Sequence, residues 1–340
     1  MAALSLANTQ LLLTELNNVV GQAWARNIES MVDQVCQRVP SGSAQTTFFW
    51  SPKLNKMRLW NGPRVVQEPG LRSYNVVNQT FENTLGIDRF LVDDLQVDAL
   101  FRMLPDLVEQ AQYQPDYMLR DLLENSGDQT GNRQVGMDGL NGFSTVHPQA
   151  MYQPSPSGAA TYPNDFTGGG QVIAMPTPAG GTTNVTVGGA FGPTAVMTLI
   201  GYMKSLKAED NETFGVNPNL LVHHAQLEGE VNLVLKSMFF APPAWSTITG
   251  QVGAAENPIQ KYGLKPYINR LLTLPFVWYL FDTTRSFKPL IHTVRNETVM
   301  VPRVNENDPV VYANHQLQYG QWNRQAVAFG PPWMFARSGP

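Results

Sequence analysis

Residues 46–87, TTFFWSPKLNKMRLWNGPRVVQEPGLRSYNVVNQTFENTLGI, hold the pattern that decides the fold. The run 46–50 reads as a strand, and the apolar positions from Tyr74 to Ile87 indicate a returning strand. Turn-forming residues separate the two strands: Pro52, Asn61-Gly62-Pro63 and Pro69-Gly70. Few side chains between residues 51 and 72 suit a core. The segment therefore predicts an extended hairpin that makes sense only if another chain covers it.

A long helix is predicted just after this hairpin. Residues 93–124 carry one apolar stripe at helical spacing, and Asp93 and Asp94 can cap the start of the helix. Pro105 and Pro115 each remove a backbone donor. We therefore expect a kink or a break in the helix at each proline.

The rest of the chain combines helices and strands. Residues 4–38 read as a helix, and residues 125–192 are rich in Gly and Pro, with short strands at 171–175 and 182–187. Further helices are expected at 193–207 and at 225–238, and Met238 in the second should face inward. Further strands are expected at 219–222, 276–281, 290–292 and within 299–332. The sequence therefore predicts the α+β class.

Charged residues are scarce: they make up 15% of the 340 residues, against about 25% in an average soluble domain. This fits either a large, weakly charged enzyme or a subunit that buries its surface against copies of itself. The net charge is −4 without any Lys/Arg cluster, which argues against a dedicated nucleic-acid reader. No apolar run reaches the roughly 20 residues of a membrane span, and no basic region opens a signal peptide, so we expect neither membrane insertion nor export.

The sequence contains no recognisable catalytic or metal-binding motif. The single cysteine, Cys36, excludes an intrachain disulfide, and its valine neighbours predict a buried, inert thiol. His223 and His224 are adjacent, and neighbours on a strand point to opposite faces, so we expect one packed ring and one exposed ring. A soluble hydrolase that uses either histidine with a nearby carboxylate is an alternative, which a monomer with a pocket at His224 would favour. Otherwise we expect no catalytic residue, cofactor or metal.

Charge is divided unevenly around the hairpin. Residues 51–80 hold five basic residues and one acid, a net +4, whereas residues 81–130 hold eleven acids and three bases, a net −8. One explanation is chance together with a solvated acidic helix face. The other is a basic arm that lies over the acidic region of a neighbouring subunit, where complementary charge sets the register and weakens with salt. The candidate interface residues are Lys53, Lys56, Arg58, Trp60, Arg64 and Arg72 on the arm, with Asp93, Asp94 and Asp98 on the acidic region.

Several motifs, in consistent order over roughly residues 48–335, resemble those of the Mu-type bacteriophage major head subunit family. The first are Arg58-x-Trp60-x-Gly62-x-Arg64 and Tyr74-x-Val76-x-Asn78-x-x-Phe81-Glu82-x-Thr84. The others are Asp138-Gly139-x-x-Gly142-Phe143-Ser144-Thr145-x-His147-Pro148, Asn217-Pro218-x-x-Leu221-Val222, Trp278-Tyr279-Leu280-x-Asp282-Thr283-x-Arg285-x-x-Lys288-Pro289-Leu290-Ile291 and Tyr319-Gly320-x-x-x-Arg324-x-x-x-x-Phe329-Gly330. Ser144 and Val146 stand where the family pattern has acids, which puts any ion-binding or hydrogen-bonding role of those acids in doubt.

This resemblance implies the Hong Kong ninety-seven capsid fold, with an N-terminal arm, an extended loop hairpin, a spine helix, a peripheral lobe and an axial lobe. The implied ranges are 1–45 for the arm, 46–88 for the extended loop, 89–150 for the peripheral lobe with the spine helix, 151–190 for a connecting region, 191–290 for the axial lobe and 291–340 for return strands of the peripheral lobe.

The resemblance also implies a function in shell assembly. Copies would form the hexamers and pentamers of a tailed-phage head, in contact with scaffold, portal and decoration proteins, and would enclose double-stranded DNA with non-specific contacts. The protein would be part of the virion and would assemble in the host cytoplasm. An encapsulin-like nanocompartment shell is the alternative within this fold, and nuclease-protected DNA inside purified particles would argue against it.

Overall fold

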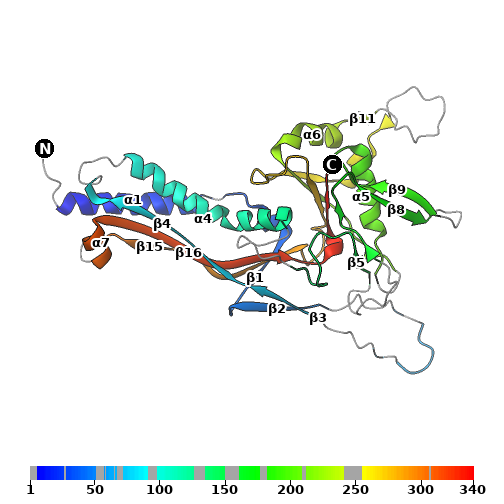
Figure 1. Ribbon diagram of the computed structural model, residues 1–340, viewed down its shortest axis with the longest axis horizontal. Helices are drawn as coiled ribbons and strands as arrows, with labels where there is room; N and C mark the ends of the chain where they lie inside the picture. Colours follow the sequence, from blue (N-terminus) through cyan, green and yellow to red (C-terminus); the bar gives the residue numbers. More distant parts are fainter. Residues whose placement is uncertain are drawn as a thin grey trace.

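The computed structural model describes residues 6–26, 28–50, 57, 59–64, 66, 72–90, 98–125, 135–149, 161–176, 182–208, 212–240, 255–305 and 308–340. These residues form an elongated part, built on long strands and two long helices, and a compact part around a second sheet (Figure 1). Both contain helices and strands, which confirms the predicted α+β class.

A four-stranded sheet is the central element of the elongated part. Its strands lie in the order β1 (Cys36–Pro40), β15 (Leu290–Arg303), β16 (Gln316–Phe329) and β4 (Gln79–Asp88). Strand β16 is antiparallel to both of its neighbours, and β1 is parallel to β15. Helices α1 (Leu6–Ala25) and α4 (Asp98–Asn125) lie on one side of this sheet, and the short helix α7 (Pro309–Asn314) joins β15 to β16 at its far end (Figure 1).

The prediction of one helix over residues 4–38 is wrong in its second half. Helix α1 ends at Ala25, a short helix α2 spans Met31–Val35, and β1 follows at once. Strand β1 pairs with β15 from Cys36↔Leu290 to Pro40↔Val294. This pairing with a strand about 250 residues away outweighs the local helical pattern, because strand pairing and burial override propensity.

We expected a kink or a break at each proline, and the break is absent: α4 runs from Asp98 to Asn125 through Pro105 and Pro115. Each proline leaves one carbonyl of the preceding turn without its intrahelical donor. The apolar stripe of α4 offsets this cost because it is buried in two core clusters: Leu104, Leu107 and Val108 in one, and Met118, Leu119, Leu122 and Leu123 in the other.

The compact part is built on a five-stranded sheet. The strand order is β13 (Lys265–Ile268), β10 (Leu220–His223), β14 (Trp278–Phe281), β17 (Phe335–Ser338) and β7 (Asp165–Phe166). All four residues of β10 and of β14 are buried. Helix α5 (Pro193–Ser205), η1 (Ala225–Leu227) and helix α6 (Glu228–Lys236) contribute their apolar faces to the core of this part.

The predicted helices and strands of this region are confirmed, with one error: Met238 is 68% exposed rather than turned inward. Three small two-stranded sheets and two short 3-10 helices complete the part. They are β5 (His147–Pro148) with β6 (Thr161–Tyr162), β8 (Gln171–Pro176) with β9 (Thr182–Val187), β11 (Phe239–Phe240) with β12 (Ala255–Glu256), η2 (Pro258–Tyr262) and η3 (Pro332–Met334). Among the described residues, no helix is long and apolar enough to cross a membrane.

The expected hairpin is present as β2 (Gln45–Trp50) and β3 (Arg72–Val77), antiparallel from Gln45↔Val77 to Trp50↔Arg72. Asn78 interrupts the predicted returning strand, and β4 then pairs with β16 in the four-stranded sheet. Asn78 is buried and fixes the junction between β3 and β4: its Nδ2 donates to Ser41 Oγ (2.8 Å), and its Oδ1 accepts from Thr293 Oγ1 (2.7 Å). The part of the hairpin that leaves the sheet is therefore residues 45–77.

Candidate assembly surface

The tip of the hairpin exposes large apolar side chains. Among the described tip residues, Met57 is 100%, Leu59 82%, Trp60 69% and Val66 81% exposed. Single exposed apolar residues are ordinary, but a contiguous group on a projecting arm is typical of an interaction site. The base of the hairpin differs, because Val76 is buried against Ile291 and Ala328 of the four-stranded sheet.

Trp60 and Arg64 form one unit at this tip. The indole Nε1 of Trp60 donates to the carbonyl of Gly62 (2.6 Å), and the Arg64 guanidinium lies 5.3 Å from the centre of the indole ring. Gly62 has φ +98°, a conformation that favours glycine. These contacts explain the spacing Trp60-x-Gly62-x-Arg64: the glycine makes the turn that brings the cation over the aromatic face.

Of the nine predicted interface residues, the structure brings only Trp60 and Arg64 together. Strand β3 begins at Arg72, opposite Trp50, and helix α4 begins at Asp98. The side chains of these two residues lie outside the described part of the structure. The other five, Lys53, Lys56, Arg58, Asp93 and Asp94, lie wholly outside the described residues.

Helix α4 offers less free negative charge than its sequence suggests. Asp116 accepts from Ser30 Oγ (2.9 Å) and from the amide of Val32 (3.1 Å), which fixes the start of α2. Asp121 pairs with Arg120 (2.7 Å), and Glu124 accepts from the backbone amides of residues 273 and 274. Asp106 and Glu109 are the exposed acids on the described face of the helix.

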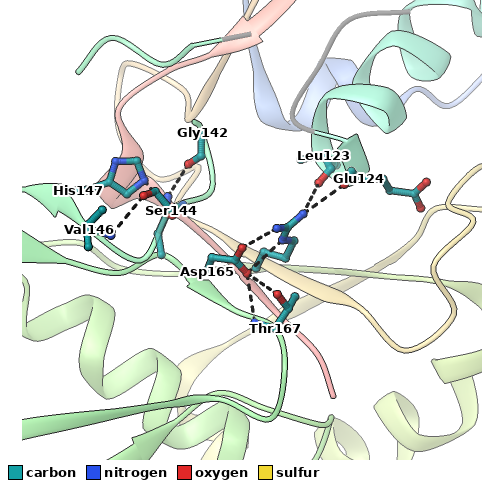
Figure 2. Close-up of polar contacts among 10 residues, drawn as sticks. Leu123, Glu124, Gly142, Ser144, Val146, His147, Asp165 and Thr167 are labelled. Atoms are coloured by element: carbon teal, nitrogen blue, oxygen red, sulfur yellow. Dashed lines mark hydrogen bonds and ion pairs between the residues drawn. The ribbon is translucent and has the colours of Figure 1, made fainter. Parts of the chain in front are cut away.

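An arginine joins the end of α4 to the compact part. Arg337 on β17 forms an ion pair with Asp165 (2.6 Å), and its Nη1 donates to the carbonyls of Leu123 (3.4 Å) and Glu124 (3.3 Å). These are carbonyls of the last turn of α4, which lack intrahelical donors and favour a cation. Figure 2 shows Leu123 and Glu124 at the end of the helix, facing Asp165.

The same contacts set the charge of Asp165. Burial alone would raise the pKa of this carboxyl, but the hydrogen bonds and the charge of Arg337, with hydrogen bonds from Thr167, hold the pKa below its usual value. The pair could not be predicted from the sequence, because its partners are 172 residues apart. No local pattern in the sequence carries a signal for it.

A second polar cluster explains the motif from Asp138 to Pro148. His147 is fully buried, with Nδ1 2.5 Å from Asp138 Oδ2 and Nε2 3.0 Å from Asn164 Oδ1. Asn164 Nδ2 donates to the carbonyls of Gly142 (2.8 Å) and Pro332 (3.2 Å), so its Oδ1 must face the ring. Both ring nitrogens are occupied. This leaves His147 in a structural role, without a free nitrogen for acid–base chemistry.

Ser144 keeps a hydrogen-bonding role where the family pattern has an acid. Its amide donates to Asn164 Oδ1 (2.8 Å), and its Oγ accepts from the amide of Val146 (3.2 Å). Figure 2 shows Ser144 and Val146 beside His147, with Gly142 at the edge of the cluster.

The adjacent histidines also have structural contacts. We expected one packed and one exposed ring, and only the packed ring is found: His223 is buried, its Nδ1 lies 2.9 Å from the carbonyl of His224, and burial lowers its pKa. His224 is half-buried, and its Nδ1 accepts from the amide of Gln226 at the start of η1. Within the described part of the chain, no group of three or more His, Cys, Asp or Glu side chains could hold a metal ion.

Cys36 is buried, and burial raises the pKa of its thiol well above the usual value, as expected for an inert cysteine.

Comparison with known proteins agrees with the motifs. Residues 9–172 and 270–338 match the family described as Mu-like prophage major head subunit gpT. This chain belongs to that family. The matched residues include both strands of the hairpin, α4, and the strands β15 and β16. The unmatched residues 173–269 contain α5, α6 and β10 of the compact part.

One relative in the family is the major capsid protein of Escherichia phage Mu, which is 30% identical over 130 residues. The match covers 37% of this chain and 40% of the relative, so it spans about two fifths of that protein.

Solved structures establish the fold. The procapsid of bacteriophage JBD30 matches 98% of this chain and 76% of its own, with a TM-score of 0.53 and 22% identity. The structure of Microbacterium phage Oxtober96 matches 93% of this chain and 92% of its own, with a TM-score of 0.52 and 11% identity. These similarities confirm the Hong Kong ninety-seven type of capsid fold.

Proposed function

We propose that this chain is the major capsid protein of a tailed bacteriophage. Many copies assemble into hexamers and pentamers and close an icosahedral head around double-stranded DNA. The observation that carries this proposal is the hairpin of residues 45–77. Its base packs on the four-stranded sheet, whereas its described tip exposes Met57, Leu59 and Trp60. An arm of this kind is complete only when a second copy covers it.

Within this proposal the lobes follow the expected ranges, with two adjustments. Strand β4 pairs with β16, so we assign residues 79–88 to the peripheral lobe and keep 45–77 as the extended loop. Strand β17 pairs with β14, so we assign residues 335–338 to the axial lobe with most of 191–290. Residues 1–44 form the N-terminal arm, α4 is the spine helix, and 151–190 connect the lobes.

The proposed partners follow from this role. They are other copies of the chain, together with scaffold, portal and decoration proteins. Contact with the packaged DNA is non-specific, because the sequence has a net charge of −4 and no basic cluster. The protein acts in the virion without enzymatic activity or membrane contact, after assembly in the host cytoplasm.

Docking of the arm on a neighbour is the proposed assembly step. The basic side chains of Lys53, Lys56, Arg58, Arg64 and Arg72 lie over the acidic region of Asp93, Asp94 and Asp98 on an adjacent subunit, and Trp60 anchors the tip. Complementary charge of this kind governs the register and the rate of association more than the final affinity.

A double charge reversal tests this step. We expect Arg58→Glu/Arg64→Glu to abolish shell formation, or to slow it severely, because like charges then face each other across the interface. The subunit itself should stay folded, since the described tip residues Met57, Leu59 and Trp60 are exposed. Negative-stain microscopy measures particles and circular dichroism measures folding. Normal shells from the reversed chain would contradict arm docking.

A further inference from the structure

The dipeptide Asn-Gly occurs twice in the sequence, at Asn61-Gly62 on the hairpin tip and at Asn141-Gly142 beside the buried His147 cluster. In such a pair the backbone amide nitrogen of the glycine can attack the side-chain amide of the asparagine, because glycine has no Cβ atom to hinder the approach. Both pairs are therefore candidates for covalent modification. The structure places them in very different surroundings.

The pair at the tip is open to solvent. Asn61 and Gly62 are both exposed, and Gly62 has φ +98°. The carbonyl of Gly62 accepts a hydrogen bond from Trp60 Nε1 (2.6 Å). Within the described part of the chain, however, neither the amide nitrogen of Gly62 nor the side chain of Asn61 makes a hydrogen bond. The two reacting groups are therefore free to turn toward each other.

The second pair is held in place. Asn141 is half-buried and forms a β-bridge with Val135, whereas Gly142 is buried. The carbonyl of Gly142 accepts from Asn164 Nδ2 (2.8 Å), and a Cβ atom on Gly142 would lie 2.3 Å from the ring of Phe329. The backbone here cannot rotate without breaking a hydrogen bond and leaving its contact with the core.

We infer that Asn61 is a site of spontaneous deamidation and that Asn141 is protected from it. The backbone nitrogen of Gly62 attacks Cγ of Asn61. A bond forms between this nitrogen and Cγ, the bond from Cγ to Nδ2 breaks, and the proton of the Gly62 amide leaves with Nδ2 as ammonia. Water then opens the five-membered imide at either carbonyl, which gives aspartate or isoaspartate. Water is the only co-reactant.

The difference between the two sites follows from how often each reaches the reactive geometry. Ring closure needs the nitrogen and Cγ in contact along the line of attack. An exposed pair without competing hydrogen bonds samples that arrangement freely. Asn141 reaches it only when the bridge to Val135 and the packing of Gly142 open locally, and such opening costs free energy in a buried segment.

Deamidation changes both the charge and the shape of the tip. It places a carboxylate next to Trp60, whose ring lies 5.3 Å from the Arg64 guanidinium, and offers this cation a negative partner. The net charge of residues 51–80 falls from +4 to +3, because one neutral side chain becomes acidic. Isoaspartate also lengthens the backbone and so alters the Trp60-x-Gly62-x-Arg64 spacing.

Peptide mapping of the full chain tests the inference. The protein is incubated at mildly alkaline pH, which favours loss of the amide proton, and below the concentration of assembly. Trypsin then releases residues 59–64 as one peptide, mass spectrometry measures deamidation, and enzymatic methylation detects isoaspartate. Asn61 should react at least about tenfold faster than Asn141. In urea the two sites should react at similar rates, because the fold no longer restrains Asn141.

The outcomes decide between structure and sequence as the cause. Faster reaction at Asn61 in the folded chain, with similar rates in urea, supports the inference. Equal rates in the folded chain, or an Asn61 that reacts only in urea, overturns it. Asn61→Gln is the control, because its longer side chain would have to close a six-membered ring, and residues 59–64 of this chain should stay unmodified. None of these results depends on shell formation.

The effect on assembly is measured separately, and this step alone rests on the proposed function. Asn61→Asp reproduces the charge of the deamidated tip, and Asn61→Gln keeps it neutral. By light scattering, the aspartate chain should assemble at least about twofold more slowly than the glutamine chain, and the difference should fade at high salt. Equal rates would overturn the effect on assembly, whereas the peptide map alone decides the deamidation.

Discussion

A chain with Gly330→Ala should lose about 3 kcal/mol of unfolding free energy. A Cβ atom at this position would lie 2.3 Å from the carbonyl oxygen of Pro289 and 2.9 Å from its carbonyl carbon. Both are backbone atoms, so no side-chain rotation relieves the overlap. The amide of Gly330 also donates to the same carbonyl (3.0 Å), and the backbone shift that relieves the overlap would disturb this bond. Urea unfolding followed by tryptophan fluorescence, below the concentration of assembly, measures the loss.

Gly201→Ala is the matched control. Gly201 lies inside α5, is exposed, and a Cβ there would meet nothing within 4 Å. Alanine is favoured over glycine inside a helix by about 1 kcal/mol, so this chain should be as stable as the wild type or more stable. A Gly330→Ala chain with an unchanged urea midpoint would contradict the close approach of Gly330 to the backbone of Pro289. It would also contradict our explanation of the glycine in the Phe329-Gly330 pair of the motif.

Arg337→Ala should cost about 2–3 kcal/mol of unfolding free energy. The change leaves the Asp165 carboxylate, which is 16% exposed, without its cation, and it removes two hydrogen bonds to the last carbonyls of α4. The control is Arg38→Ala, because Arg38 pairs with Glu297 but both side chains are exposed, 57% and 70%. Its loss should stay below about 1 kcal/mol. Equal losses in the two chains would contradict the assigned role of Arg337.

The Arg337 effect should depend on pH in one direction. The pKa of Asp165 is lowered in the folded chain, so the stabilisation is fully present above the unfolded pKa of an aspartate, about 3.9. It is lost as the pH falls through the folded value. The difference in unfolding free energy between wild type and Arg337→Ala should therefore shrink below about pH 4. A difference that stays constant from pH 7 to pH 3 would contradict the pairing.

Local patterns predicted the elements whose stability is mostly local. The helix that begins at Pro193, the strand of Leu220–His223 and the hairpin of β2 and β3 all follow from apolar spacing and turn residues. The strand at residues 36–40 was predicted as a helix, because its strand conformation depends on the parallel partner at Leu290–Val294. Helix α7 was missed for a related reason: residues 309–314 interrupt a stretch that otherwise alternates as strands do.

The assembly surface was predicted in part. The Trp60-x-Gly62-x-Arg64 spacing identified two residues that the structure brings together. The charge count overestimated the acidic surface of α4, because Asp116, Asp121 and Glu124 bind groups within the chain.

Negative-stain electron microscopy of the purified full chain at high concentration tests the central claim most directly. We expect closed, round shells of uniform size, built from ring-shaped groups of subunits. Light scattering on the same sample should show a large, discrete assembly. A chain that stays monomeric, or forms only small oligomers, at every concentration and salt condition would contradict the claim that copies of this protein assemble into a closed shell.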